Sequence, residues 1–156
     1  MSVKAIPEGY NGVTPYLSID GAAEAIEFYK RAFNADELFR LAAPNGNIAH
    51  AEIKISGSPV MLADSCKETG FQDPKNLKGT SVGLHIYVED VDALFSRAID
   101  AGAKIVKAIE DQFYGDRNGT LEDPFGHFWF ISTHKEDLSP EEIATRAKEL
   151  FSQSNA

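Results

Sequence analysis

Three side chains of this sequence could do acid–base chemistry: His50, Glu52 and His85. His50 and Glu52 are two positions apart in an extended run, and alternate residues of a strand point to the same face. They could position a cationic or hydroxyl group of a substrate, or simply hydrogen-bond to each other. His85 lies among apolar residues, and an imidazole ordinarily titrates near neutral pH. It could therefore act as a general acid or base, or form a structural hydrogen bond with Tyr16.

The other chemically active side chains offer less. Asp116 and Arg117 are neighbours where a strand is expected to begin, so they either form a local ion pair or leave Arg117 to hold an anionic group. Cys66 and His134 have polar neighbours but no evident partner that would make a nucleophile and base pair. We assign neither of them a catalytic role.

Composition narrows the functional classes. The chain has 156 residues, 43% of them hydrophobic and 25% charged, which fits one globular domain with a substantial core. No apolar run approaches the roughly 18 residues of a membrane span, and the net charge of −9 repels phosphate backbones. We therefore expect neither a membrane nor a nucleic-acid partner. The first residues lack the features of a signal peptide and Cys66 is the only cysteine, so we expect a cytoplasmic protein.

Alternation, helical periodicity and turn residues predict a first βαβββ module over residues 13–63. Its elements are a strand at 13–19, a helix at 21–33 that ends near Asn34, strands at 37–42 and 48–55 around the turn Asn45-Gly46, and a strand at 60–63.

The same order recurs in a second module over residues 80–133. It has a strand at 82–88, a helix at 91–101 capped by Gly102, strands at 104–109 and up to 122, and a last strand at 127–133. Equivalent residues are 69 positions apart, as with Leu17 and Ile86 or the turn glycines Gly57 and Gly126. This constant offset favours an internal duplication over a chance similarity of two strand–helix units.

Two segments lie outside the repeat within the single domain of residues 1–156. Residues 64–79 connect the modules and serve either as a lid or only as a linker. Residues 139–152 predict a C-terminal helix, because Ser139-Pro140-Glu141-Glu142 forms a capping box and its apolar residues share one face. That face should dock on this subunit or on a partner.

Strand alternation also predicts which side chains line a pocket. One face of the strands should pack under the helices with Trp129 and Ile131. The opposite face mixes aromatic and polar groups, which suits a pocket for organic molecules, although it could instead pack on a partner subunit. With the polar residues above, the candidate ligand-binding side chains are Tyr16, His50, Glu52, Met61, His85, Tyr87, Arg117 and Phe130.

Three features together resemble the vicinal oxygen chelate superfamily, which includes glyoxalase I, extradiol dioxygenases and bleomycin-resistance proteins. They are the paired βαβββ modules, the helix containing Phe28-Tyr29 with its exit at residues 33–35, and the turn at residues 122–127 before the last strand. The run from Tyr114 to His127 looks most similar to the PhnB-like branch. The resemblance implies an α+β fold in which two modules form a U-shaped mixed sheet around a cavity, and a homodimer.

The resemblance also implies four metal-ligand positions, which correspond here to Thr14, Met61, Gly83 and Phe130. None of them is His, Glu or Asp, and a divalent metal requires imidazole or carboxylate donors. We therefore expect no cofactor at the usual centre. A displaced site built from His50, Glu52 and His85 is the alternative.

These observations lead to three hypotheses about function. The first is a small-molecule-binding protein that sequesters its ligand, as in the bleomycin-resistance branch, without the usual metal. The second is an enzyme, either metal-independent with His85 or Glu52 as base, or a lyase or dioxygenase with the displaced metal site. The third is a dimeric scaffold without a ligand.

Overall fold

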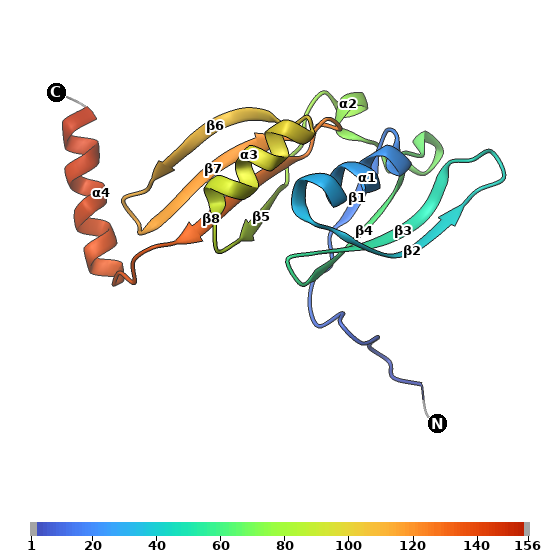
Figure 1. Cartoon of the computed structure of the whole chain (residues 1–156), viewed down its shortest axis with the longest axis horizontal. Coiled ribbons are helices and arrows are strands. Elements are labelled where there is room, and N and C mark those ends of the chain that lie inside the picture. The colour runs from blue at the N-terminus through green and yellow to red at the C-terminus, as the bar shows by residue number, and fades with distance from the viewer. Residues whose placement is uncertain (1–2, 155–156) are drawn as a thin grey trace.

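The computed structural model describes residues 3–154 and contains two modules of the same topology (Figure 1). The N-terminal module consists of β1 (Tyr16–Ile19), α1 (Ala22–Phe33), β2 (Asp36–Ala42), β3 (Ile48–Ile55) and β4 (Ser58–Asp64). The C-terminal module consists of β5 (Gly83–Tyr87), α3 (Val91–Ala101), β6 (Lys104–Asp111), β7 (Asp116–Glu122) and β8 (Phe128–His134). Between them lie the short helical turns η1 (Lys67–Thr69) and α2 (Pro74–Leu77), and α4 (Pro140–Ser154) follows.

The two sheets have equivalent strand orders, β1-β4-β3-β2 and β5-β8-β7-β6. In each, the first strand runs parallel to the last and the other neighbours are antiparallel. The predicted α+β fold of two repeated modules with a C-terminal helix is confirmed. The modules are two separate four-stranded sheets, because no backbone ladder joins β1 to β5 in the described chain.

Local sequence signals explain where the first elements end. Asn34 ends α1 in the left-handed conformation (φ 52°) and donates its N–H to the Tyr29 carbonyl, which is the expected C-cap. Asn45-Gly46 forms the turn between β2 and β3, with Gly46 at φ 88°. Both predictions are confirmed.

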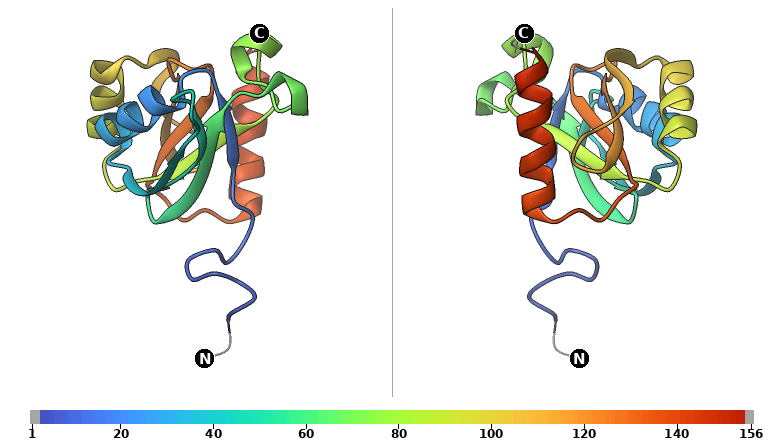
Figure 2. Two further views of the ribbon diagram at one scale, coloured as in Figure 1. Left: turned by 90° about the vertical axis from the view of Figure 1, so that its right-hand side faces the viewer. Right: turned by 90° about the vertical axis from the view of Figure 1, so that its left-hand side faces the viewer.

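Helices α1 and α3 lie side by side and cover the same side of the two sheets (Figures 1 and 2). An aromatic cluster joins the modules beneath them. The Trp129 ring of β8 lies 4.5 Å from the ring of Phe33 and 5.4 Å from that of Tyr29, both on α1. Trp129 is 1% exposed, so its predicted place in the core is confirmed. Burial of such large rings supplies much of the contact energy between the modules.

The Asp123 carboxylate anchors this junction from within the turn between β7 and β8. It is 3% exposed and accepts hydrogen bonds from the Tyr29 hydroxyl at 2.6 Å and from Trp129 Nε1 at 2.9 Å. The backbone N–H groups of Phe125 and His127 also donate to it. Burial, followed by the nearby carboxylate, raises the pKa of Tyr29 well above its usual value. One buried group thus links the first helix to the last turn.

Helix α4 stands apart from both cores. The predicted capping box is present, because Ser139 Oγ accepts from the Glu142 N–H and the Glu142 carboxylate accepts from the Ser139 N–H. No residue of α4 is buried, and Leu150 and Phe151 are 44% and 59% exposed. The helix lies on the side of the sheets opposite α1 and α3 (Figure 2). Within residues 3–154, no helix combines the length and apolar character needed to cross a membrane.

Replacing Asp123 with Ala should lower the free energy of unfolding by about 3–5 kcal/mol, because it leaves the buried Tyr29 and Trp129 donors without an acceptor. Urea unfolding followed by Trp129 fluorescence measures the change. The control is Asp100→Ala, which removes an exposed carboxylate of α3 and should change the free energy of unfolding far less. Equal stability of the two variants would contradict the role of Asp123.

Candidate functional site

The sheet faces turned away from α1 and α3, called the open faces from here on, carry most of the candidate ligand-binding residues. On the N-terminal open face Tyr16 is 43% exposed, and on the C-terminal open face Tyr87 and Phe130 are 57% and 40% exposed. Met61 is half-buried beside Tyr16, its register partner on β1. The exposed aromatic side chains are therefore on the faces that alternation predicts.

The N-terminal open face holds a chain of hydrogen bonds. The Tyr16 hydroxyl lies 2.6 Å from His50 Nδ1, and His50 Nε2 lies 3.1 Å from Glu52 Oε1. Tyr10 donates its hydroxyl hydrogen to the other oxygen of Glu52. Hydrogen bonds from Tyr10 and then from His50 lower the pKa of Glu52, so its carboxylate is ionised at neutral pH. The same bond raises the pKa of Tyr10 to about 12.

Tyr10 is the residue that sequence reasoning missed. It lies in the irregular segment before β1, where no periodicity assigns a face, and it joins the site through a contact 42 residues away in sequence. Phe39 of β2 also joins the cluster, with its ring 6.2 Å from that of His50. The expected bond between His85 and Tyr16 was wrong, because Tyr16 bonds to His50 instead.

His85 belongs to a second cluster on the C-terminal open face. Its Nε2 lies 2.7 Å from Ser132 Oγ, and its ring stacks on Tyr87 with centroids 4.8 Å apart. The Tyr87 hydroxyl donates to Asp116 at 2.6 Å, and Asp116 also contacts His134 Nδ1 at 2.8 Å. Burial acts to raise the pKa of Asp116, but the bonds from Tyr87 and His134 lower it overall. His134 therefore supports the site from its edge.

Arg117 lies apart from both clusters. Its guanidinium binds Asp92 of α3 at 2.8 Å and Asp111 of β6 at 3.1 Å. Its register partner Thr133 accepts from the Val91 N–H at the start of α3, which places this pair on the helix side of the sheet. The expected ion pair between Arg117 and its neighbour Asp116 was wrong, because Arg117 pairs with Asp92 and Asp111 while Asp116 contacts Tyr87 and His134.

The four positions that the fold assigns to metal ligands lie in pairs, one pair in each module. The Met61 N–H donates to the Pro15 carbonyl next to Thr14. A Cβ atom added at Gly83 would lie 2.4 Å from the Phe130 ring, so this ring fills the place of a ligand side chain. A hydroxyl, a thioether and two positions without donor atoms do not fit a divalent metal.

The displaced metal site is also not assembled in one chain. His50 and Glu52 are on the N-terminal open face and His85 is on the C-terminal one, and no group of three His, Cys, Asp or Glu side chains within residues 3–154 is placed to share an ion. The arrangement within each cluster instead suits hydrogen bonding to an organic molecule and transfer of a proton.

Comparison with known proteins agrees with the two-module architecture. The model of the Glyoxalase/Bleomycin resistance protein/Dioxygenase superfamily matches residues 14–131. The chain belongs to this superfamily. An uncharacterized protein of Mycobacterium tuberculosis is 44% identical over 134 residues, which cover 84% of this chain and 79% of that protein.

Two solved structures of similar fold are also related in sequence. An Arabidopsis thaliana gene product is 27% identical with a TM-score of 0.65, covering 79% of this chain and 98% of that one. TioX from Micromonospora sp. ML1 is 26% identical with a TM-score of 0.63, covering 83% of this chain and 100% of that one. These two structures support the fold, whereas the superfamily rests on the match of the family model, and none of them identifies a ligand for this chain.

The contribution of His134 to stability should depend on pH. Hydrogen bonds to Asp116 and then Asp137 raise the pKa of His134 above its ordinary value of 6.5. Protonated His134 therefore stabilises the fold fully below pH 6.5, and this stabilisation is lost as the pH rises through the raised pKa. Urea unfolding should show a larger deficit for His134→Gln at pH 5.5 than at pH 9.

The control for this measurement is Asp137→Asn, which removes only the weaker of the two partners and should keep part of the pH dependence. A deficit for His134→Gln of the same size at both pH values would mean that the ion pair with Asp116 does not stabilise the fold.

Proposed function

We propose that this protein binds and sequesters a small organic molecule on its open faces without the divalent metal that the fold can hold. The observation that carries the proposal is that both open faces present aromatic rings and oriented hydrogen-bonding groups to solvent. Sites for organic ligands combine a mainly apolar surface with a few fixed polar groups. A sheet face evolved only to meet water would carry more charge than these faces do.

The N-terminal cluster supports a ligand with a cationic or hydroxyl group. The ionised Glu52 carboxylate bonds to His50, and the rings of Tyr16 and Phe39 lie 5.4 and 6.2 Å from the His50 ring. A carboxylate next to aromatic faces attracts an organic cation through charge and through the ring quadrupole. The net charge of −9 acts in the same direction over a longer range.

A second copy of the chain completes the cavity in this proposal. The chain exposes 9741 Å², whereas a folded monomer of 17.1 kDa is expected to expose about 7,800 Å², an excess of roughly 1,900 Å². The segment before β1 and α4 stand away from the modules and account for part of this excess, and the rest is surface that a second copy could bury (Figure 1). Because the two open faces of one chain lie side by side, a partner is needed to enclose a ligand against them (Figure 2).

Two further features of the sequence support narrower assignments, one of the branch of the superfamily and one of the cellular compartment. The run from Tyr114 to His127 favours the PhnB-like branch of the superfamily. The lone Cys66 favours a reducing compartment such as the cytoplasm, because no disulfide stabilises the fold.

An enzyme is the second candidate function, and the chain Tyr16–His50–Glu52 favours it. A histidine between a carboxylate and a hydroxyl is the arrangement in which a general base is oriented. The two functions differ in whether the bound molecule is chemically changed. A binding protein returns its ligand unchanged, whereas an enzyme releases a product that mass spectrometry detects under multiple turnover.

A thermal-shift screen tests the proposal with three ligand classes: cationic antibiotics, α-ketoaldehydes with glutathione, and catechols. A ligand at 100 times its Kd stabilises the fold by about 2.7 kcal/mol, which raises Tm by about 5–10 °C in a domain of this size. We expect cationic compounds to give this shift and Glu52→Gln to abolish it. Measurement with EDTA present should give the same shift.

The matched control is Asp137→Asn, which removes an exposed carboxylate outside the open faces and should leave the shift intact. The proposal is wrong if no cationic compound raises Tm, or if the shift survives Glu52→Gln. A shift that disappears with EDTA would instead favour a displaced metal site.

A further inference from the structure

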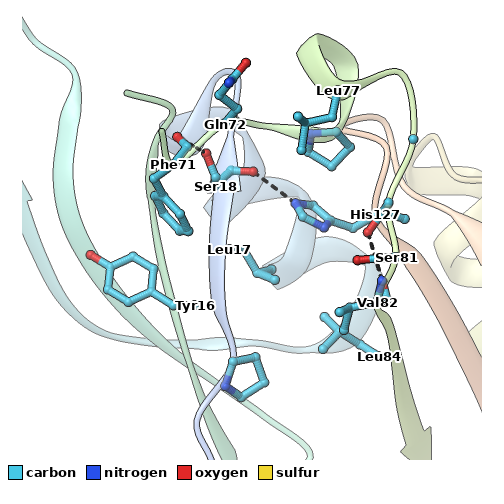
Figure 3. A pocket seen from close by; sticks show the side chains of 14 residues that line it. Tyr16, Leu17, Ser18, Phe71, Gln72, Leu77, Ser81, Val82, Leu84 and His127 are labelled. Carbon is cyan, nitrogen blue, oxygen red and sulfur yellow. Dashed lines mark hydrogen bonds between the residues drawn. The ribbon is translucent and has the colours of Figure 1, made fainter. Parts of the chain in front are cut away.

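A pocket of about 680 Å³ lies between the two modules, next to Tyr16 of the N-terminal cluster (Figure 3). Strand β1 forms one wall and the start of β5 forms the other, while the connection between the modules closes one end. Tyr16 is the only residue of the two clusters that also lines it. Its volume lies in the range of about 300–1,000 Å³ typical of sites for small molecules.

The walls of this intermodule pocket are mainly apolar and well supported. Leu17 and Leu84 face it from the two modules, and Phe71 and Pro74 face it from the connection. The connection is held in place because Asp73, which is fully buried, accepts from two N–H groups at the start of α2. Pro74 packs so closely on Gly126 that a Cβ atom there would lie 2.8 Å from the proline ring. The pocket is therefore bounded by packed structure.

His127 gives the pocket a buried, oriented hydrogen-bonding group, in addition to the polar side chains of Ser18, Gln72, Thr80 and Ser81. The side chain is 8% exposed, and its Nε2 lies 3.2 Å from the Ser18 carbonyl oxygen. A carbonyl only accepts, so Nε2 carries a hydrogen, and whenever Nδ1 carries none its lone pair is free to accept. Figure 3 shows the ring at the pocket wall, with one nitrogen bonded to Ser18 and the other turned away from it.

Nδ1 of His127 has no hydrogen-bond partner among residues 3–154. Every fully enclosed side-chain nitrogen and oxygen in that part of the chain does have a partner, so Nδ1 must border open space. An acceptor on a side chain that is more than nine-tenths buried and that lines a mainly apolar pocket is a strong recognition element. A ligand group that donates a hydrogen bond to this acceptor gains affinity, whereas a ligand that cannot donate leaves the acceptor unpaired.

We propose that the intermodule pocket binds a neutral molecule of the phenol type, with an apolar ring and one O–H donor. The ring lies between Leu17 and Leu84, and the O–H donates to Nδ1 of His127. A phenolate is disfavoured because it has no hydrogen to donate to this nitrogen. The pocket shares Tyr16 with the N-terminal cluster, but the contacts proposed here, Leu17, Leu84 and His127, lie outside that cluster, so this binding does not depend on the proposed function.

Isothermal titration with a matched pair of probes, 4-ethylphenol and 4-ethylanisole, tests the site. The two molecules share the apolar body, but only the phenol can donate. At pH 7.5 the phenol should bind about tenfold more tightly to the full chain, because one hydrogen bond distinguishes the pair. Equal affinities, or no binding of the phenol, would overturn the proposal.

Variants locate the bound probe. His127→Phe should reduce the affinity for the phenol to that for the ether. Val82→Trp should abolish binding of both by filling the pocket, and it is expected to fold because Val82 is 64% exposed. Ile105→Trp is the matched control, since Ile105 is 55% exposed and lies on β6 outside the pocket.

Glu52→Gln separates this site from the open faces. Phenol binding that is unchanged by Glu52→Gln and lost in Val82→Trp supports the intermodule pocket. Loss of phenol binding in Glu52→Gln, or its persistence in Val82→Trp, would overturn the intermodule site. Neither result would decide the proposed function, which the thermal-shift screen tests.

Discussion

The rest of the structure depends on one buried carboxylate. Asp123 takes hydrogen bonds from Tyr29 of α1, from Trp129 of β8 and from two N–H groups of its own turn. These four donors hold the buried carboxylate in one position, because moving any donor away would leave a polar group without a hydrogen bond. The two modules are consequently held with α1 and α3 against each other on one side of the sheets (Figure 1).

Two consequences of this constraint bear on function. The first is that both open faces of a chain lie on the other side of the sheets, where they present the clusters around His50 and His85 to solvent (Figure 2). The second is that His127, whose N–H is bonded to Asp123, is held with its ring against the intermodule pocket. The hydrogen bonds of Asp123 therefore help to position the groups of the proposed open-face site. They also help to position the groups that line the intermodule pocket.

The superfamily membership and the details of this chain also fit together. A divalent metal in such a fold needs donor side chains at the paired strand positions, but here the Phe130 ring occupies the space beside Gly83. The Phe130 ring, the Thr14 hydroxyl and the Met61 thioether at these places are poor ligands for a divalent metal, which is why we propose binding of an organic molecule without one. His50 and Glu52, which were the alternative metal ligands, instead form a hydrogen-bonded pair in which the pKa of the Glu52 carboxylate is lowered.

The sequence predicted the repeat, the strand faces and the caps, because these depend on local patterns such as alternation and the left-handed residue Asn34. It did not predict Tyr10, whose segment has no periodicity, or the pairing of His85 with Ser132, which depends on side-chain rotamers across a strand pair. The contact between Ser18 and His127 joins residues 109 positions apart. No local pattern specifies such contacts, so the intermodule pocket could only be found in the folded chain.

We propose that the open faces are half of a cavity that a second copy completes. Light scattering of the full chain across a range of concentrations measures this most directly. We expect a mass twice the 17.1 kDa of one chain at micromolar concentration. A mass of one chain at every concentration, with Tyr16 and Tyr87 fully accessible to solvent quenchers or labelling reagents, would contradict it.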